Sequence, residues 1–333
     1  MHITKPAYYD TFRCIAADCP DSCCKEWDVQ VDDITAARYR ELSGTLGDRL
    51  REVLKDEDGE TVMTIVDGRC PMWRRDGLCR IQAELGHEAL CKTCRDFPRL
   101  THDYGDFQEW GLELSCPEAA RIILSVQDPE YVTVVHPGGE DAEYDEEAMK
   151  VLLRTRETMR TILTDRSRPV GETLALALMY GYQAQGELDG GEPQSFDPVS
   201  ALKAAKEFAS AGDTGAILEF FKNLEILTPE WAAQLNGPAP SRWSGEHLIL
   251  ARYFIDRYWL QAVSDYDLVS RVKLAVISCL VIKTLGGNLL RTAQLYSKEI
   301  ENDIDNIEAI LDGAYECPAF TDDRLLDVLM LET

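Results

Sequence analysis

The sequence lacks the features that mark membrane-embedded and secreted proteins. Its longest strongly apolar run, Leu274 to Ile282, is far shorter than the roughly 20 residues that a membrane-spanning helix needs. The N-terminal stretch contains no apolar core of the kind that a signal peptide requires. We therefore expect a soluble, cytoplasmic protein with no membrane partner.

Basic residues are also scarce. Lys and Arg number 34 against 59 Asp and Glu, and the formal net charge is −25. No block of Lys or Arg offsets this balance, so a phosphate backbone would be repelled and nucleic acid is not an expected partner. A lysine-bearing or otherwise basic partner would be attracted, although acidity also serves plain solubility.

Several nucleotide-binding and hydrolytic motifs are missing as well. The sequence contains no G-x-G-x-x-G after an expected strand, no P-loop, no G-x-S-x-G elbow and no H-E-x-x-H. No familiar loop therefore places a cofactor pocket in this chain.

What the sequence does have is an uneven distribution of cysteine. It contains 11 cysteines in 333 residues, and all but Cys279 and Cys317 precede residue 117. A reducing compartment disfavours a disulfide framework, and an odd number would leave one thiol unpaired. Clustered thiols in that setting indicate metal binding. The candidate metal ligands are Cys14, Cys19, Cys23, Cys24, Cys70, Cys79, Cys91, Cys94 and Cys116.

The spacing of these cysteines supports metal binding without identifying the metal. Two close pairs, Cys19-x3-Cys23 and Cys91-x2-Cys94, can each direct two sulfurs at one ion or cluster. The turn-containing loop from Cys70 to Cys79 brings these two cysteines within reach of the same ion or cluster. Nine thiolates exceed the four that one zinc ion takes, whereas eight would serve two four-iron clusters. Spacing alone leaves zinc and iron–sulfur both open.

The adjacent cysteines Cys23 and Cys24 bear on the number of metal sites. Neighbouring side chains tend to diverge, so one small ion would be strained by both thiols. The doublet indicates a multi-iron cluster, two separate sites, or one idle thiol.

Apolar patterning predicts a chain in two parts. Residues 1–128 form a cysteine-rich module with a helix over 34–54, short strands over 61–66 and 110–114, and a helix over 115–126. Ser115 and Glu118 resemble a capping box for the last helix. Cys116 would then lie at a helix N-terminus, where the dipole favours a thiolate.

Residues 129–333 are expected to form a helical domain after one strand at 131–135. Helices are predicted over 143–164, 171–185, 198–211, 214–226, 245–264, 268–285 and 287–311. The segment 268–285 is apolar nearly all round and is expected to be the central buried helix. The predicted fold is mainly α, with a small irregular cysteine-rich metal-binding module containing short strands followed by an all-helical domain.

The cysteine-rich module contains a succession of motifs: Phe12-x-Cys14-x4-Cys19-x3-Cys23-Cys24-x2-Trp27, Cys70-Pro71, Gly77-Leu78-Cys79-x-Ile81, Leu90-Cys91-x2-Cys94-Arg95-x2-Pro98-Arg99 and Leu114-Ser115-Cys116-Pro117-Glu118-Ala119-Ala120. This succession resembles the flagellin lysine-N-methylase family. More distantly it is similar to a broader family of zinc- or iron-chelating proteins with clustered cysteines. Weaker matches to the first family follow in the helical part, from Glu246-x-Leu248 to Tyr253-Phe254 and at Ser270-Arg271-Val272-Lys273.

The resemblance implies methyl transfer from S-adenosylmethionine to lysine side chains of flagellin, together with a cysteine-ligated iron–sulfur cluster, expected to be 4Fe-4S, with zinc as the alternative. The alternative function is a non-enzymatic zinc- or iron-binding protein whose helical part binds a partner. Candidate pocket residues beside the motifs are Tyr8, Tyr9, Trp27, Arg95 and Arg99. The aromatics could equally pack around the metal, and the arginines could form ion pairs or hydrogen bonds to a cluster.

Overall fold

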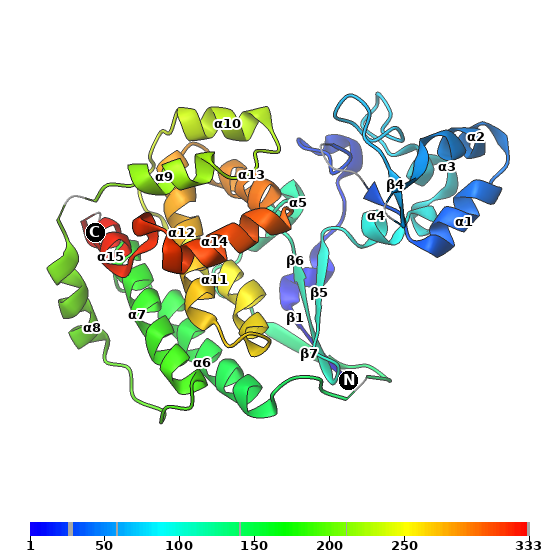
Figure 1. The fold of residues 1–333 in the computed structure, drawn as a ribbon. Coiled ribbons are helices and arrows are strands. Elements are labelled where there is room, and N and C mark those ends of the chain that lie inside the picture. Colours follow the sequence, from blue (N-terminus) through cyan, green and yellow to red (C-terminus); the bar gives the residue numbers. More distant parts are fainter. Residues whose placement is uncertain (26–28, 58, 140, 211, 332–333) are drawn as a thin grey trace.

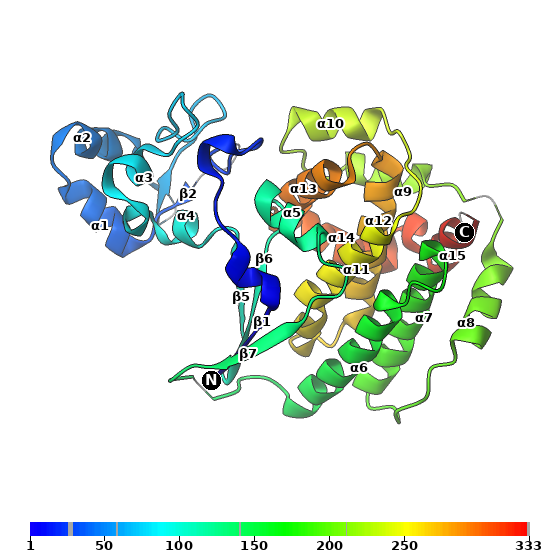
Figure 2. The ribbon, with the colours of Figure 1, turned by 180° about the vertical axis from the view of Figure 1, so that it is seen from behind.

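The computed structural model describes residues 1–25, 29–57, 59–139, 141–210 and 212–331. Figure 1 shows a small N-terminal unit on one side and a larger helical body on the other. Between them lie the strands β1 (His2–Pro6), β5 (Arg99–Asp103), β6 (Phe107–Leu112) and β7 (Tyr131–Val135). Figure 2 shows the same arrangement from behind. The protein is mainly helical with two small sheets, which confirms the predicted fold class at that level.

The small unit combines short helices with an antiparallel sheet. The sheet has the strand order β2-β4-β3, with Val29 opposite Met63 and Leu54 opposite the same residue. The elements are β2 (Val29–Gln30), α1 (Asp33–Glu41), α2 (Gly44–Val53), β3 (Leu54–Glu57), β4 (Glu60–Met63), α3 (Arg80–Leu85) and α4 (Lys92–Asp96).

The predicted single helix over 34–54 is wrong, because α1 and α2 are separated at Leu42 and Ser43. The chain folds back there so closely that a Cβ at Gly47 would stand 1.9 Å from the Leu42 carbonyl oxygen. The Arg51 guanidinium donates to that carbonyl at 2.6 Å. The close approach at Gly47 and the hydrogen bond from Arg51 thus separate two helices where the apolar periodicity of the sequence is continuous.

A second, mixed sheet joins segments that are far apart in the sequence. Its strands are β5 (Arg99–Asp103), β6 (Phe107–Leu112), β1 (His2–Pro6) and β7 (Tyr131–Val135), in the spatial order β5-β6-β1-β7. Strand β1 runs parallel to β6, with Ile3 opposite Gln108, and antiparallel to β7, with Ile3 opposite Val134. The small unit is therefore inserted between β1 and β5 of this sheet.

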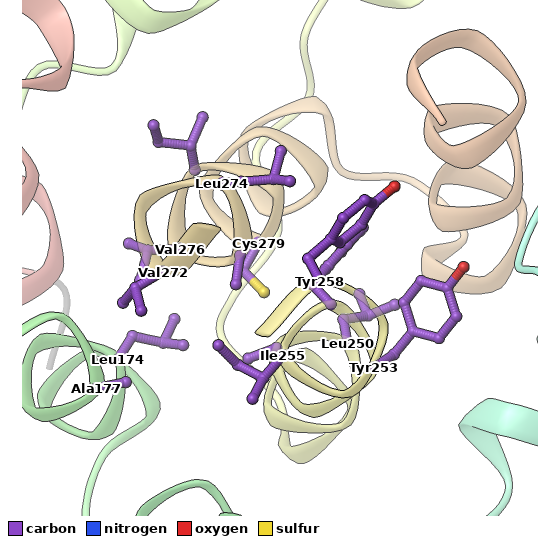
Figure 3. Close-up of a cluster of buried hydrophobic side chains, with 14 of the residues drawn as sticks. Leu174, Ala177, Leu250, Tyr253, Ile255, Tyr258, Val272, Leu274, Val276 and Cys279 are labelled. Atoms are coloured by element: carbon purple, nitrogen blue, oxygen red, sulfur yellow. The ribbon is translucent and has the colours of Figure 1, made fainter. Parts of the chain in front are cut away.

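The helical body is built around α12. Every residue of α12 is buried, as predicted, and it packs against α7, α11 and α14. Figure 3 shows Cys279 of α12 among side chains of α7 and α11, including Leu174 and Ile255. The elements are α5 (Pro117–Leu124), α6 (Glu146–Thr164), α7 (Val170–Leu188), α8 (Pro198–Ala205), α9 (Gly215–Lys222), α10 (Pro229–Asn236), α11 (Gly245–Tyr258), α12 (Leu268–Leu285), α13 (Leu289–Ile300), α14 (Ile304–Glu316) and α15 (Asp322–Leu331).

Two predictions in this part are wrong. The segment 287–311 contains two helices, α13 and α14, because Glu301 ends the first and the Asp303 carboxylate caps the second by accepting from Asn306 N at 3.1 Å. The expected capping box at the start of α5 is absent, since the Ser115 hydroxyl instead donates to Glu113 at 2.5 Å and Cys116 is the N-cap residue.

Buried apolar side chains form two clusters. One belongs to the small unit and runs from Val29 to Cys91, whereas the other includes Tyr9, Phe12, strand β6, helix α5 and the helical body. The division at residue 128 into two domains stays a prediction. None of the described helices has the length and apolar character required to cross a membrane.

Candidate metal and cofactor site

A cavity of about 620 Å³ lies where the small unit meets the helical body. Its lining includes the loop around Cys19, the start of α5, and Leu227, Lys298 and Asn302 from the helical body. Seven thiols line it: Cys14, Cys19, Cys23, Cys24, Cys79, Cys94 and Cys116. The two remaining N-terminal cysteines are buried in the core of the small unit. The fold thus gathers the cysteines from four separate motifs around one region.

Several thiols already interact with one another. Hydrogen-bonding interactions with Cys23 and Cys70 lower the pKa of Cys24 to about 3. The same interactions, reinforced by burial, raise the pKa of Cys23 and of Cys70. The Cys70 thiol also lies within reach of the Met63 sulfur, to which it donates at 3.5 Å. A thiol can donate only while it is protonated, so one thiolate in this trio is stabilised at the expense of its two neighbours.

A second interacting pair lies on α4. The Cys94 thiol donates to the Cys91 sulfur, which lowers the pKa of Cys91 and raises that of Cys94. The interaction follows from the Cys-x2-Cys spacing across the first turn of a helix, because Cys91 is the N-cap residue and Cys94 lies inside.

Cys116 is the N-cap residue of α5, as its position before Pro117 predicts. Burial raises its pKa to about 11, although hydrogen bonds from the backbone N–H groups of Ala119 and Glu118 act in the opposite direction. The expectation that the helix N-terminus favours its thiolate is therefore outweighed by desolvation. A bound cation would reverse this balance.

Among the described residues, no three Cys, His, Asp or Glu side chains are arranged to hold a metal ion together. The chemistry of the donor set nevertheless fits a thiolate-preferring metal. The donors around the cavity are sulfurs in large excess over carboxylates, and soft sulfur ligands select zinc and iron–sulfur clusters. The side chains around the cavity are therefore of the type that binds either zinc or an iron–sulfur cluster.

Asp21 anchors the cysteine loop to the helical body. Its carboxylate is 6% exposed and accepts from Arg291 Nη1 at 3.0 Å and from Gln294 Nε2 at 3.0 Å, both on α13. Lys298 of the same helix lies 3.5 Å away. Burial raises the pKa of Asp21, but these α13 side chains outweigh it and keep the pKa below its usual range. The loop between Cys19 and Cys23 is thereby held against α13.

Basic side chains line the same cavity. Arg13, Arg95, Arg99 and Lys298 are among its lining residues. The Arg99 guanidinium lies 5.1 Å from the centre of the Phe12 ring, and the Arg95 side chain pairs with Asp96 at 3.3 Å. Positive charge therefore surrounds a site made of potential thiolates, in a chain that is strongly acidic overall.

The candidate pocket residues have different locations. Arg95 and Arg99 line the cavity. Tyr9 is buried against Trp110, with ring centres 5.6 Å apart, and Tyr8 is placed near Asp256 and Arg252 in the helical body. Trp27 lies outside the described residues.

Sequence reasoning did not find Asp21, Lys298 or Asn302. Lys298 and Asn302 lie more than 180 residues after Cys116, the last cysteine of the motifs, and nothing in their surroundings marks them as site residues. Asp21 did carry a signal in the sequence, because an acidic residue between two candidate ligand cysteines is an unusual choice unless a cation compensates its charge.

No protein-family model and no solved structure matches the chain. A curated protein named lysine-N-methylase, from Salmonella typhimurium, is 35% identical over 136 residues, which cover 38% of this chain and 33% of the relative. A protein of the same name from Salmonella choleraesuis matches to the same extent.

The flagellar biosynthetic protein FliU of Salmonella muenchen is 34% identical over 133 residues, which cover 38% of this chain and 79% of FliU. The match thus spans about a third of the lysine-N-methylases but most of FliU, and it confirms the resemblance seen in the cysteine motifs. The chain belongs to the family that comprises these lysine-N-methylases and FliU.

Proposed function

We propose that this protein is a lysine N-methyltransferase that transfers a methyl group from S-adenosylmethionine to lysine side chains of flagellin. We further propose that a cysteine-ligated iron–sulfur cluster, of the 4Fe-4S type, is bound at the cavity between the small unit and α13. The observation that carries the proposal is the match to proteins named lysine-N-methylase and FliU, in a chain whose cysteine motifs surround one cavity.

The size of the cavity suits a cofactor. Its volume of about 620 Å³ is within the range of about 300–1,000 Å³ that ligand pockets occupy. S-adenosylmethionine has a carboxylate at its amino-acid end. We assign that carboxylate to the basic group around Arg99 and Lys298, because a guanidinium or ammonium forms strong charge-assisted hydrogen bonds with such a group.

The transfer itself requires a neutral amine. The lysine nitrogen forms a bond to the methyl carbon as the carbon–sulfur bond breaks, and S-adenosylhomocysteine leaves. An exposed lysine titrates near 10.4, so the ammonium must first lose a proton to a base or to water. Nearby cations such as Lys298 lower the pKa of an incoming ammonium, because like charges disfavour the charged form.

Bound by these thiolates, an iron–sulfur cluster would supply a metal centre next to the cofactor. The part played by the chain is to position the groups. Asp21 holds the Cys19 loop against α13, and α5 presents Cys116 to the same cavity. Fixed geometry of this kind accounts for a large part of the rate of a two-substrate transfer.

Substrate attraction is consistent with the overall charge. A protein with a net charge of −25 attracts a lysine-bearing surface over long distances. Such steering is screened within about 8 Å at physiological ionic strength, so methylation should slow as salt rises.

A labelled-methyl assay tests the proposal directly. Anaerobically purified protein would be incubated with flagellin from the same organism and methyl-labelled S-adenosylmethionine, and cofactor binding would be measured by calorimetry. Lys298→Gln should weaken cofactor binding about tenfold, the loss of one charge-assisted contact. Lys150→Gln on the exposed face of α6 is the matched control and should bind normally.

Two results would contradict the proposal. One is the absence of transfer to flagellin and to any protein of a cell extract, combined with no measurable binding of S-adenosylmethionine. The other is equal binding by the Lys298 and Lys150 variants, which would remove the assigned pocket. The first result would favour a non-enzymatic metal-binding protein.

A further inference from the structure

Strand β5 lies at an edge of its sheet. Among the described residues, β6 is the strand that pairs with β5, and the spatial order β5-β6-β1-β7 leaves the other side of β5 without a partner strand. Thr101 and Asp103 of β5 are exposed, which agrees with an edge position. Figure 1 shows β5 running away from the small unit along the sheet. An edge strand can pair with a further extended segment through its outward backbone groups.

The hydrogen bonds at the two ends of β5 show which of its backbone groups face outward. Pro98 O accepts from Glu113 N at 2.9 Å, and Tyr104 N donates to Phe107 O at 3.0 Å. Bonded and non-bonded pairs alternate along an antiparallel ladder, so the even-numbered residues of β5 bond to β6. The N–H and C=O groups that point away from β6 therefore belong to the odd-numbered residues Arg99, Thr101 and Asp103.

Two cavities adjoin opposite ends of β5. The cavity that the cysteines surround includes Arg99 in its lining. A second cavity, of about 1040 Å³, includes Thr101, His102 and Asp103. Four residue steps of about 3.3 Å each separate Arg99 from Asp103, a distance of about 13 Å. An extended segment along the outer edge of β5 therefore reaches from one cavity to the other.

The charge at the far end of β5 favours a basic segment. Of basic side chains, the second cavity includes Arg271, which already pairs with Asp265 at 2.8 Å. Its carboxylates come from β5 and from the segment before α6, and they are Asp103, Asp141, Glu143 and Asp145. The rings of Tyr104 and Tyr144 also line it, with their centres 6.3 Å apart. Carboxylates and aromatic rings together attract an ammonium or guanidinium group.

We propose that the lysine-bearing segment of the protein substrate binds as an additional strand along the outer edge of β5. Its backbone pairs with the outward groups of Arg99, Thr101 and Asp103. The target lysine enters the cavity of the cysteines at the Arg99 end, and a second basic residue lies over the carboxylates at the Asp103 end. This mode of binding rests on the proposed function, because the segment is that of the methylation substrate.

Pairing with β5 defines the kind of segment that is recognised. Main-chain hydrogen bonds supply affinity for any extended sequence, and alternate side chains supply specificity. Side chains four positions apart lie on the same face of a strand, so the second basic residue stands about four positions from the target lysine. A helix could not make these main-chain bonds. The methylated lysines therefore lie in segments that are extended or unstructured when they bind.

Binding of a synthetic peptide to the full chain tests the proposal without requiring methyl transfer. The probe is a fluorescent peptide of about twelve residues, rich in serine and threonine, with one lysine and one arginine four positions apart. Thr101→Pro removes an outward N–H and no bond to β6, a position at which edge strands tolerate proline. It should weaken binding at least about tenfold, measured by fluorescence anisotropy. Thr101→Val keeps the N–H and is the matched control, with unchanged affinity.

The acidic end of β5 is tested separately. Asp141 and Glu143 are exposed, and the double variant Asp141→Asn/Glu143→Gln should weaken binding about three- to fivefold at low salt. The same variant should bind a peptide with alanine in place of the arginine as well as the wild-type chain does. Glu308→Gln, at an exposed position on α14, is the matched control and should bind both peptides normally.

Backbone methylation of the peptide covers the case in which Thr101→Pro does not fold. Methyl groups on the amide nitrogens of alternate residues block the bonds to β5 in one frame and point away from β5 in the other. One set of methylated peptides should therefore lose affinity for the wild-type chain, and the other set should keep it.

The proposal is overturned if the wild-type chain does not bind the peptide, if both methylated sets bind equally, or if the two Thr101 variants bind alike. Conversion of a dimer to a monomer by Thr101→Pro would also overturn it, because β5 would then pair with a second copy of the chain. Absence of methyl transfer with peptide binding intact counts against the proposed function alone. Transfer to flagellin that the β5 variants leave unchanged counts against docking at β5 alone, so the two failures are distinguishable.

Discussion

The small unit and the helical body are stabilised by different chemistry. In the body, α12 is buried along its whole length and the surrounding helices cover it with apolar side chains. In the small unit, the helices and strands are short and thiols take part in the core. Apolar periodicity therefore predicts most elements of the helical body, whereas the small unit combines short elements with a core that includes the buried thiols of Cys70 and Cys91. The comparison implies that metal removal and core truncation should affect different parts of the chain.

The largest effect is expected from metal removal. Anaerobic protein treated with ferricyanide and a zinc chelator should lose hydrogen-exchange protection in α1, α2 and β4 by more than about a hundredfold, because structural metal contributes folding energy directly. Protection in α12 should be unchanged. Mass spectrometry of exchanged peptides measures both regions in one sample. A parallel loss in α12 would mean that the two regions unfold as one.

A core truncation should have the converse effect. Trp259 is fully buried, and its indole Nε1 donates to the Leu152 carbonyl at 2.9 Å. Trp259→Ala should lower the free energy of unfolding of the helical body by about 3–5 kcal/mol. Denaturant unfolding followed by helical circular dichroism measures the change.

The control for this truncation is Val199→Ala on α8, since Val199 is 76% exposed. It should change the free energy of unfolding by no more than about 0.5 kcal/mol. Equal effects of the two substitutions would contradict the assignment of the core.

A partly buried carboxylate on α11 joins β7 to the helical body and gives a pH-dependent test. Asp256 accepts from Arg160 Nε at 2.7 Å, from Arg252 Nε at 2.9 Å and from the Tyr131 hydroxyl. Burial raises the pKa of Asp256, but the two guanidinium groups outweigh it and the net pKa is lowered. Asp256→Asn should cost about 2–3 kcal/mol at pH 7, the range for hydrogen bonds to charged groups.

The sign of the pH dependence follows from the lowered pKa. The carboxyl of the unfolded chain titrates near 3.9, so the contribution of Asp256 is fully present above about pH 5. It is lost as the pH falls below 4 through the lower pKa of the folded state. Unfolding measured for wild type and variant from pH 7 to pH 3 should show a shrinking difference. A constant difference would exclude a charged Asp256 as its source.

The smallest effect is expected at the connection between the two regions. Asp21→Asn removes the charge that Arg291 and Lys298 share, and Arg291 keeps a second partner in Glu230. The variant should lose about 1–2 kcal/mol of stability, because a buried charged hydrogen bond is replaced by a neutral one. Limited proteolysis should cut near residue 21 faster. The exposed Asp10, paired with Lys5, gives the control Asp10→Asn, which should be indistinguishable from wild type.

The sequence predicts most of the helical body because its signals are local. Helix α12 has the predicted bounds, since Asp267 caps it by accepting from Ser270 N and Gly286 ends it at a φ of +67°. Helix α10 had an equally local signal in Thr228-Pro229, a cap residue followed by a proline, and sequence reasoning overlooked it. Capping residues, proline and glycine in the sequence thus indicate where these helices begin and end.

The remaining features depend on contacts that span the chain. The end of α13 falls at Glu301, which is buried and paired with Arg257 of α11 at 3.2 Å. The parallel pairing of β1 with β6 joins segments about a hundred residues apart. Among the residues that line the cavity, the cysteines were indicated by their clustering, and Arg95 and Arg99 by their position beside the cysteine motifs. Lys298 reaches the cavity only through the packing of α13. No sequence window contains that information.

The central position of β1 sets an order of events during synthesis. Strand β1 emerges from the ribosome before either of its partners, because β6 and β7 both lie beyond residue 106. At about 5–20 residues per second, β1 waits roughly 7–26 s before β7 is complete. All the cysteines of the small unit emerge within that interval. The small unit is therefore synthesised completely, with all its thiols, before the sheet that holds both its ends can form.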